Sequence, residues 1–292
     1  MRLESVHASL CGMRDERRHG MAEYHGVFER KEVKYRLSSA QHKAVLSALR
    51  GRLAPDVYGS ALVKSVYFDT DERDMIAHSL EKPLYKEKLR VRSYGTPSEA
   101  DPVFVEIKKK YDGVVYKRRI AMSYAAARAY LGGASYEAAC IAYPLDEPGA
   151  FSAFAKTNLQ VAHEIDALMR RWGPLRASML TTCVRTAYGP IDESGIGVAD
   201  EGGLRVTFDA SLGYCDLHGS RARVKTVPLI GPEETIMEVK SRGPYPLWLA
   251  DALDACGAYP SSFSKYGEAY RRCAKNASSL LVADSCQEVR CA

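Results

Sequence analysis

The sequence predicts an α+β protein built on one antiparallel β-sheet with helices packed outside it. Segments in which charged and apolar residues alternate, a pattern typical of strands with one buried face, occur both before and after a central helical region. Because both groups of strands place charge on one face, a single sheet explains them more simply than two domains. The 292 residues, 46% hydrophobic and 26% charged, are enough to bury a core of ordinary composition.

The first half of the chain is predicted to contain five strands and two short helical segments. Ser38 or Ser39 is a suitable N-cap for the first helix, and Gly51 a suitable end. The Asp112-Gly113 pair favours a tight hairpin turn, because glycine tolerates a positive φ. In chain order we expect a strand at 30–37, a helix at 38–49, a strand at 62–69, a helical turn at 71–80, and strands at 86–92, 103–108 and 114–121.

The second half is predicted to be mainly helical at first and then to return to strands. Gly132-Gly133 separates two short helices, and Gly173-Pro174 ends a longer one. The predicted elements are helices at 124–131, 136–143 and 151–172, strands at 182–188, 205–210 and 235–240, and helices at 246–256 and 264–275. We expect one folded domain over residues 27–275, with a disordered arm at 1–26 and a flexible tail at 276–292.

Positive charge is concentrated in the segment from Lys82 to Arg119. It holds eleven Lys or Arg and five acids, a balance of +6, whereas the whole chain carries +5. Positions 86, 88, 90 and 92 are all cationic, while 89 and 91 are apolar, so the four cations share one face of a strand. In the next strand the apolar positions 103, 105 and 107 share one face, and Glu106, Lys108 and Lys110 share the other face.

A solvated charged face is the simpler explanation for any single one of these strands. Like charges on neighbouring strands repel one another, however, so an ordinary solvent face usually mixes both signs. A cationic face repeated over several strands therefore indicates that a polyanion binds there.

Several classes of chemistry are disfavoured by what the sequence lacks. The eight cysteines form no CxxC pair and the seven histidines no HExxH motif, so any metal is expected to be a hard ion held by carboxylates. The sequence contains no GxxxxGK[ST], GxGxxG or GxSxG motif. Many Arg and Lys side chains remain, together with Glu32, Glu106 and Glu238, and this inventory suits phosphoryl transfer.

Six short motifs, in the same order along the chain, resemble the VTC domain. They are RKEVKY (30–35), SVYFDT (65–70), KLRVRSYG (88–95), VFVEIKKKYDGVVYKRR (103–119), EVK (238–240) and FSKY (263–266). The VTC domain is the polyphosphate polymerase domain of the vacuolar transporter chaperone complex and belongs to the triphosphate tunnel metalloenzyme (CYTH-like) superfamily. The resemblance covers residues 27–275 and is specific through the combination of RxRxYG, ExKKK and FSKY.

This resemblance implies an antiparallel β-barrel that forms a tunnel for a phosphate chain. The residues it marks as catalytic are Lys34, Arg90, Arg92, Lys108, Lys117, Arg185, Arg205 and Lys265. Those assigned to substrate binding are Arg118, Lys240, Ser264 and Lys110, and those assigned to a divalent metal, Mn²⁺ or Mg²⁺, are Glu238 and Glu32. The superfamily has ExExK on its first strand, whereas this chain has Arg30-x-Glu32-x-Lys34, as in the VTC branch. Glu32 is therefore expected either to bind metal or to pair with a tunnel arginine.

Three functions remain open from the sequence. The first is a polymerase that uses ATP to extend inorganic polyphosphate, and the second a tripolyphosphate or nucleoside triphosphate hydrolase of the same fold. The third is a non-catalytic module that binds polyphosphate. No nucleic-acid partner is expected, because the aromatic residues that could stack on bases lie mainly off the cationic face or at turns; they are Tyr85, Tyr94, Tyr111 and Tyr116. Since neither an SPX domain nor a membrane segment is recognisable, we expect a cytoplasmic protein, and any coupling to the inner face of a membrane would require a separate membrane-protein partner.

Overall fold

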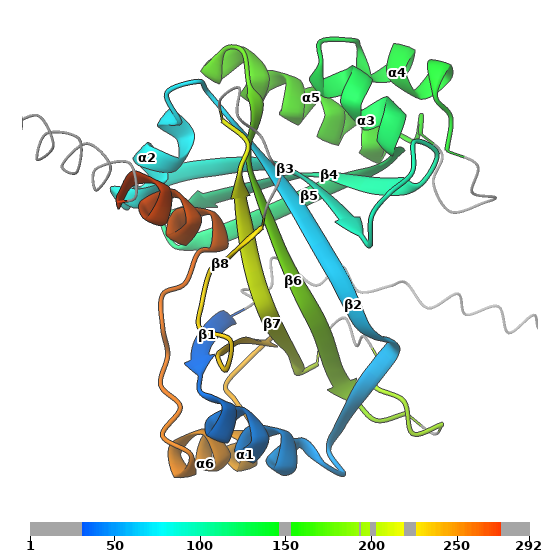
Figure 1. Ribbon diagram of the computed structural model, residues 1–292. Helices are drawn as coiled ribbons and strands as arrows, with labels where there is room; N and C mark the ends of the chain where they lie inside the picture. Colours follow the sequence, from blue (N-terminus) through cyan, green and yellow to red (C-terminus); the bar gives the residue numbers. More distant parts are fainter. Residues whose placement is uncertain (1–30, 146–152, 193, 199–202, 219–225, 276–292) are drawn as a thin grey trace, which may run out of the picture.

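The structure is a computed structural model that describes residues 31–145, 153–192, 194–198, 203–218 and 226–275 (Figure 1). The predicted arm at 1–26 and the tail at 276–292 lie outside these residues. Nine strands form one antiparallel sheet in the order β1-β9-β7-β6-β2-β3-β4-β5, and β8 pairs with β7. The strands are β1 (Lys31–Leu37), β2 (Leu53–Asp69), β3 (Tyr85–Tyr94), β4 (Pro102–Tyr111), β5 (Val114–Ser123), β6 (Arg176–Pro190), β7 (Arg205–Asp216), β8 (Val227–Pro228) and β9 (Thr235–Ser241).

The predicted α+β class, with an antiparallel sheet and helices outside it, is confirmed. The predicted closed barrel is not formed, because β1 and β5 stand at the two ends of the order and no ladder joins them within the described residues. The sheet nevertheless curls strongly, since Glu32 on β1 and Lys108 on β4 approach to 3.8 Å. The result is a tunnel-like trough whose inner face is shared by strands from both halves of the chain.

Helices cover the outer face of the sheet in two groups (Figure 1). Helices α3 (Tyr124–Leu131), α4 (Tyr136–Ala142) and α5 (Lys156–Trp172) pack on β3, β4 and β5 around Ile107, Ile120 and Ile165. Helices α1 (Ser39–Leu49) and α6 (Leu247–Ala255) pack on β1, β7 and β9 around Leu37 and Met237. No helix within the described ranges is both long and apolar enough to cross a membrane.

A third apolar cluster lies at one end of the trough. There α2 (Asp74–Leu80) lies beside the helix over residues 265–275, and Ile76, Phe263 and Tyr266 pack against residues of β2, β6 and β7. The turn between β4 and β5 lies near the start of β3, because the Asp112 amide donates to the carbonyl of Leu84. The beginning of β3, the β4–β5 turn and α2 therefore mark one end of this part of the sheet.

Most predicted elements are present; β6 and β7 are longer than predicted, and the largest difference lies at the start of β2. Asp112 (φ 43°) and Gly113 (φ 84°) both adopt positive φ, as the predicted turn requires. Strand β2 begins at Leu53 rather than Leu62, because the residues around Pro55 and Gly59 pair with β6 through a register shift despite their poor strand propensity. Helix α5 begins at Lys156 rather than at residue 151, which lies outside the described residues.

Candidate functional site

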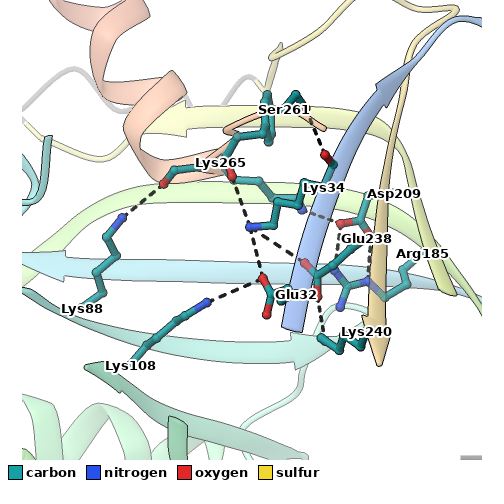
Figure 2. A network of polar contacts seen from close by, with 12 residues as sticks. Glu32, Lys34, Lys88, Lys108, Arg185, Asp209, Glu238, Lys240, Ser261 and Lys265 are labelled. Atoms are coloured by element: carbon teal, nitrogen blue, oxygen red, sulfur yellow. Dashed lines mark hydrogen bonds and ion pairs between the residues drawn. The ribbon is translucent and has the colours of Figure 1, made fainter. Parts of the chain in front are cut away.

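The inner face of the trough carries the charged side chains that the alternating pattern predicted. Arg90 lies directly opposite Glu106, which in turn lies opposite Arg119, so β3, β4 and β5 contribute side chains to the same face. Lys88 and Lys117 lie opposite Lys108 on its two sides. Figure 2 shows side chains of β1, β6, β7 and β9 converging on the same space from the other wall. These are Glu32, Lys34, Arg185, Asp209, Glu238 and Lys240.

Glu106 is a buried carboxylate surrounded by cations. Arg90 donates to it through Nε at 2.7 Å and approaches through Nη2 at 2.6 Å, while Lys117 Nζ lies 2.7 Å and Arg92 Nε 3.7 Å away. Burial disfavours the charged form, but the charges of Arg90, Arg92 and Lys117 outweigh it and lower the pKa of Glu106 to about 2. Arg90 also donates to the Tyr67 hydroxyl at 3.1 Å. This carboxylate therefore holds three of the predicted site cations in place.

Asp209 has the same role on the opposite wall. Arg185 binds it with two hydrogen bonds, Nε to Oδ1 at 2.6 Å and Nη2 to Oδ2 at 2.8 Å, and Lys265 Nζ approaches Oδ2 at 2.5 Å. Although Asp209 is almost fully buried, these two cations hold the pKa of its carboxyl well below the usual range. Asp209 was not among the predicted site residues, although it shares the sequence parity of Arg205.

Two further carboxylates, Glu32 and Glu238, approach Lys34. Lys34 Nζ lies 3.4 Å from Glu32 Oε1 and 3.9 Å from Glu238 Oε2, and Glu238 Oε1 lies 2.7 Å from Lys240 Nζ. Although burial opposes ionisation of Glu238, Lys240 and Lys34 hold its pKa far below the usual range, so it remains an anion. The ion pairs that the structure shows for Glu32 are with Lys34 and Lys108, not with an arginine as one prediction had it.

The donor set around Lys34 fits a hard divalent ion with two protein ligands. Among the described residues, no group of three or more His, Cys, Asp and Glu side chains is placed to hold a metal. Mg²⁺, however, is commonly bound through one or two carboxylates, with substrate phosphates and water completing the shell. Glu32 and Glu238 supply two such carboxylates on one side of the trough, so a substrate-assisted site is compatible with the residues present.

The FSKY element brings side chains to the inner face from the start of the helix over residues 265–275. Ser261 donates its backbone N–H to the carbonyl of Lys34 at 2.7 Å and so attaches this segment to β1. Lys265 then reaches Asp209, and Ser264 Oγ accepts from Lys88 Nζ at 3.2 Å. Lys88 was not selected from the sequence, although it has the same parity as Arg90 and Arg92.

The structure separates neighbouring cations of β5 that the sequence had grouped together. Arg118 faces outward and lies 3.3 Å from Glu164 on α5, beside the pair formed by Lys109 and Glu164, so the structure does not bring it to the inner face with the other predicted residues. Adjacent residues of a strand point to opposite faces, and Lys117 already faces inward. Arg119 was missed; it lies over the ring of Phe104 at 4.5 Å, on the inner face.

The remaining predicted residues lie toward the edges of the site. Arg205 is opposite Lys240 in the sheet and binds Asp56 of β2 at 2.8 Å. Lys110 lies opposite Lys86 near the β4–β5 turn. These residues extend the cationic face beyond the two carboxylate-centred clusters.

Tyr266 fixes the position of the FSKY element through contacts with the sheet. Its hydroxyl donates to the buried Asp69 at 2.7 Å and is hydrogen-bonded to Ser178 Oγ at 3.0 Å, while its ring stacks on Tyr67 with centroids 4.6 Å apart. Asp69 also accepts the backbone N–H groups of Met75 and Ile76 at the start of α2. Tyr266 therefore links the segment that presents Ser264 and Lys265 to α2 and to β2.

We expect Tyr266→Phe to weaken phosphate-chain binding several-fold, because Ser264 and Lys265 lose their anchor, and to lower stability by about 1–2 kcal/mol. Tyr130→Phe is the matched control: its hydroxyl makes the same kind of bond to a carboxylate, Asp166 Oδ1 at 2.7 Å, but it lies under α5. Thermal unfolding should shift in both variants, whereas titration with tripolyphosphate should show a loss only for Tyr266→Phe. Equal affinities in the two variants would assign Tyr266 to stability alone.

A curled antiparallel sheet with cations held around buried carboxylates on its inner face defines a polyanion-binding domain of the tunnel type. The family model of the VTC domain matches residues 29–273, and the chain belongs to the VTC domain family. No curated protein sequence matches the chain.

Two solved structures resemble the chain weakly. One is a proposed adenylate cyclase from Vibrio parahaemolyticus, with 12% identity, a TM-score of 0.39, and coverage of 82% of this chain and 97% of that one. The other is the Mediator head module of Schizosaccharomyces pombe, with 12% identity, a TM-score of 0.33, and coverage of 77% and 90%. Similarities at this level carry no functional argument.

Proposed function

We propose that this domain is a polyphosphate polymerase that transfers the γ-phosphoryl group of ATP to a growing inorganic polyphosphate chain. The observation that carries the proposal is the convergence of Arg90, Lys117, Arg185 and Lys265 on one inner surface in a member of the VTC domain family. Membership in this family supports a function related to polyphosphate or triphosphate. The choice of ATP as donor and of a phosphate chain as acceptor is our proposal.

The proposed reaction needs positioning and charge neutralisation rather than a protein nucleophile. A terminal oxygen of the polyphosphate chain attacks the γ-phosphorus of ATP and forms a new P–O bond. The bond between the γ-phosphorus and the oxygen that bridges to the β-phosphate breaks, and ADP leaves with that oxygen. Arg90, Arg92 and Arg185 present guanidinium groups that bind and orient phosphoryl oxygens as negative charge spreads over them.

Glu238 and Glu32 are the residues that would hold a Mn²⁺ or Mg²⁺ ion, which when bound supplies further charge neutralisation at the phosphates. Glu238 is suited to this role because its low pKa keeps it ionised throughout the neutral range. Lys34 lies beside both carboxylates and would bind a phosphate oxygen next to them. Lys240, on the other side of Glu238, holds this carboxylate in place.

The proposal is tested by incubating the full chain with ATP and Mn²⁺ and separating the products. We expect ADP together with phosphate chains that lengthen with time, because the acceptor stays bound on the cationic face between transfers. Free phosphate as the main product would overturn the polymerase in favour of a hydrolase. Tight binding of polyphosphate without ADP release would overturn it in favour of a binding module.

A further inference from the structure

Four lysines of the basic segment have no carboxylate partner, unlike the cations that gather around Glu106 and Asp209. Arg90 and Lys117 are paired with Glu106, and Arg185 and Lys265 with Asp209. In the part of the chain that the structure describes, the lysine row, defined as Lys82, Lys86, Lys88 and Lys110, forms no ion pair. Lys86 Nζ donates to the carbonyl of Ser79 and Lys88 Nζ to Ser264 Oγ, both neutral acceptors.

The lysine row brings like charges close together. Lys86 and Lys110 are directly opposite each other on β3 and β4, an arrangement that destabilises a sheet. Burial, and then the charges of Lys110 and Lys82, lower the pKa of Lys86. Burial is also the largest cause for Lys88, whose pKa is lowered to about 8 with contributions from Lys108, Lys86 and Lys34. The row is therefore a site of uncompensated positive charge that a bound anion would relieve.

The row leads from the site to the surface. Lys88, the innermost residue of the row, lies opposite Lys108 and contacts Ser264, so the row begins within the site in Figure 2. Lys86 and Lys110 follow one step outward along the same face, and Lys82 is exposed before β3 begins. This direction runs toward the end of the sheet marked by the β4–β5 turn and α2.

The ligand suited to this row is a bare phosphate chain rather than a nucleic acid. Tyr85 and Tyr111 lie directly opposite each other in the sheet at positions of the other parity, so their rings belong to the other face. Tyr67, on the inner face, is buried beneath Arg90. Single-strand binding requires exposed aromatic rings beside the cations for base stacking, and these positions do not offer them.

We propose that the lysine row is the exit track for the polyphosphate product, so that the chain leaves the trough at the β4–β5 end. This inference rests on the proposed function, because it assumes that the inner face holds a phosphate chain. It adds a direction: the end of the chain that reacts lies among Arg90, Arg92 and Glu238. The older phosphates pass Lys88, then the facing pair Lys86 and Lys110, and finally Lys82.

The test measures binding of preformed chains, so that it does not depend on turnover. We expect Lys86→Gln/Lys110→Gln to weaken the binding of a long-chain polyphosphate about tenfold and to reduce the salt dependence of that affinity by roughly 1 to 2 units of log–log slope. Tripolyphosphate, which is too short to occupy both the site and the track, should bind the variant within about twofold of the wild type. Titration of both ligands at several salt concentrations gives these values.

Lys43→Gln/Lys109→Gln is the control with the same change in net charge. Lys43 is exposed on α1, and Lys109 is the neighbour of Lys110 that faces outward to Glu164 at 2.9 Å. Equal loss in the two double variants, or loss of tripolyphosphate binding in the track variant, would overturn the track. So would a single-stranded oligonucleotide that displaces the long chain as well as polyphosphate does. If ATP is not turned over but only the track variant loses long chains, the polymerase fails and the lysine row stands as a binding track for phosphate chains, not as an exit for product.

Discussion

Glu238→Gln is expected to lower the rate of ADP release from ATP by at least about 100-fold, with the fold retained. The substitution removes the charge that Lys34 and Lys240 hold beside Glu32, and with it one of the two carboxylates suited to a divalent ion. Gln keeps the size and one oxygen of the side chain, so the loss comes from the charge rather than from packing. Steady-state ADP release with Mn²⁺, together with far-UV circular dichroism, measures both parts of the expectation.

Glu164→Gln is the matched control for this variant. Glu164 is also a carboxylate joined to two cations, Lys109 at 2.9 Å and Arg118 at 3.3 Å, but it lies on α5 at the outer face. We expect its ADP release to match that of the wild type. Full activity of Glu238→Gln would remove Glu238 from the site, and equal losses in both variants would show that the effect is general.

The alternating pattern of the basic segment was enough to predict which way its side chains point. Because side chains alternate along a strand, Arg90 and Arg92 share one face of β3, and the register between β3 and β4 places Lys108 on the same face. Consistent use of the same rule would have added Lys88 and Arg119 and removed Arg118, which cannot face inward beside Lys117. Arg118 was grouped with the inward-facing cations by motif, although the periodicity of the strand places it on the other face.

The alternating pattern could not predict contacts between residues that are distant in sequence. Tyr266 is hydrogen-bonded to Asp69, a contact across 197 residues that depends on how the last described helix crosses the sheet. The pairing of Lys265 with Asp209 depends on the same crossing. The extent of β2 was hidden because Pro55 and Gly59 have poor strand propensity, and pairing with β6 overrides it. Closure of the barrel was inferred from the resemblance, and the described strands do not bear it out.

The carboxylates of the inner face explain how a cationic surface can be stable before any phosphate binds. Glu106 and Asp209 each hold at least two cations in fixed geometry, so guanidinium and ammonium groups are in place before substrate arrives. Preorganised charge of this kind binds a developing anion without the cost of reorientation. The carboxylates and a bound phosphate chain therefore both neutralise the cations of the inner face, so a bound phosphate chain should partly replace a carboxylate that has been removed.

Glu106→Gln tests this replacement. Removing one partner from a buried ion-pair cluster leaves the others uncompensated, and we expect the free energy of unfolding to fall by about 3–5 kcal/mol. Saturating tripolyphosphate should raise the melting temperature of this variant by more than it raises that of the wild type, because phosphate oxygens replace the lost carboxylate beside Arg90 and Lys117. Thermal unfolding with and without the ligand gives the comparison.

The pH dependence of stability provides a second comparison between the wild type and the Glu106→Gln variant. The folded pKa of Glu106, about 2, lies below its ordinary value of 4.5, so its contribution is complete above pH 4.5 and is lost as the pH falls toward 2. The wild type should therefore lose roughly 3 kcal/mol over this interval that the variant does not lose. Denaturant titrations at several acidic pH values measure the difference.

Glu87→Gln separates this effect from the general cost of removing a buried carboxylate. Glu87 is as buried as Glu106 and binds Arg171 at 2.9 Å and Trp172 Nε1 at 2.8 Å, but it faces the helices outside the sheet. The Glu87→Gln variant should be less stable than the wild type, and tripolyphosphate should not restore its stability, since tripolyphosphate bound in the trough cannot reach Arg171. If tripolyphosphate stabilises both variants equally, the cations around Glu106 do not bind phosphate, and the trough is not where the chain is held.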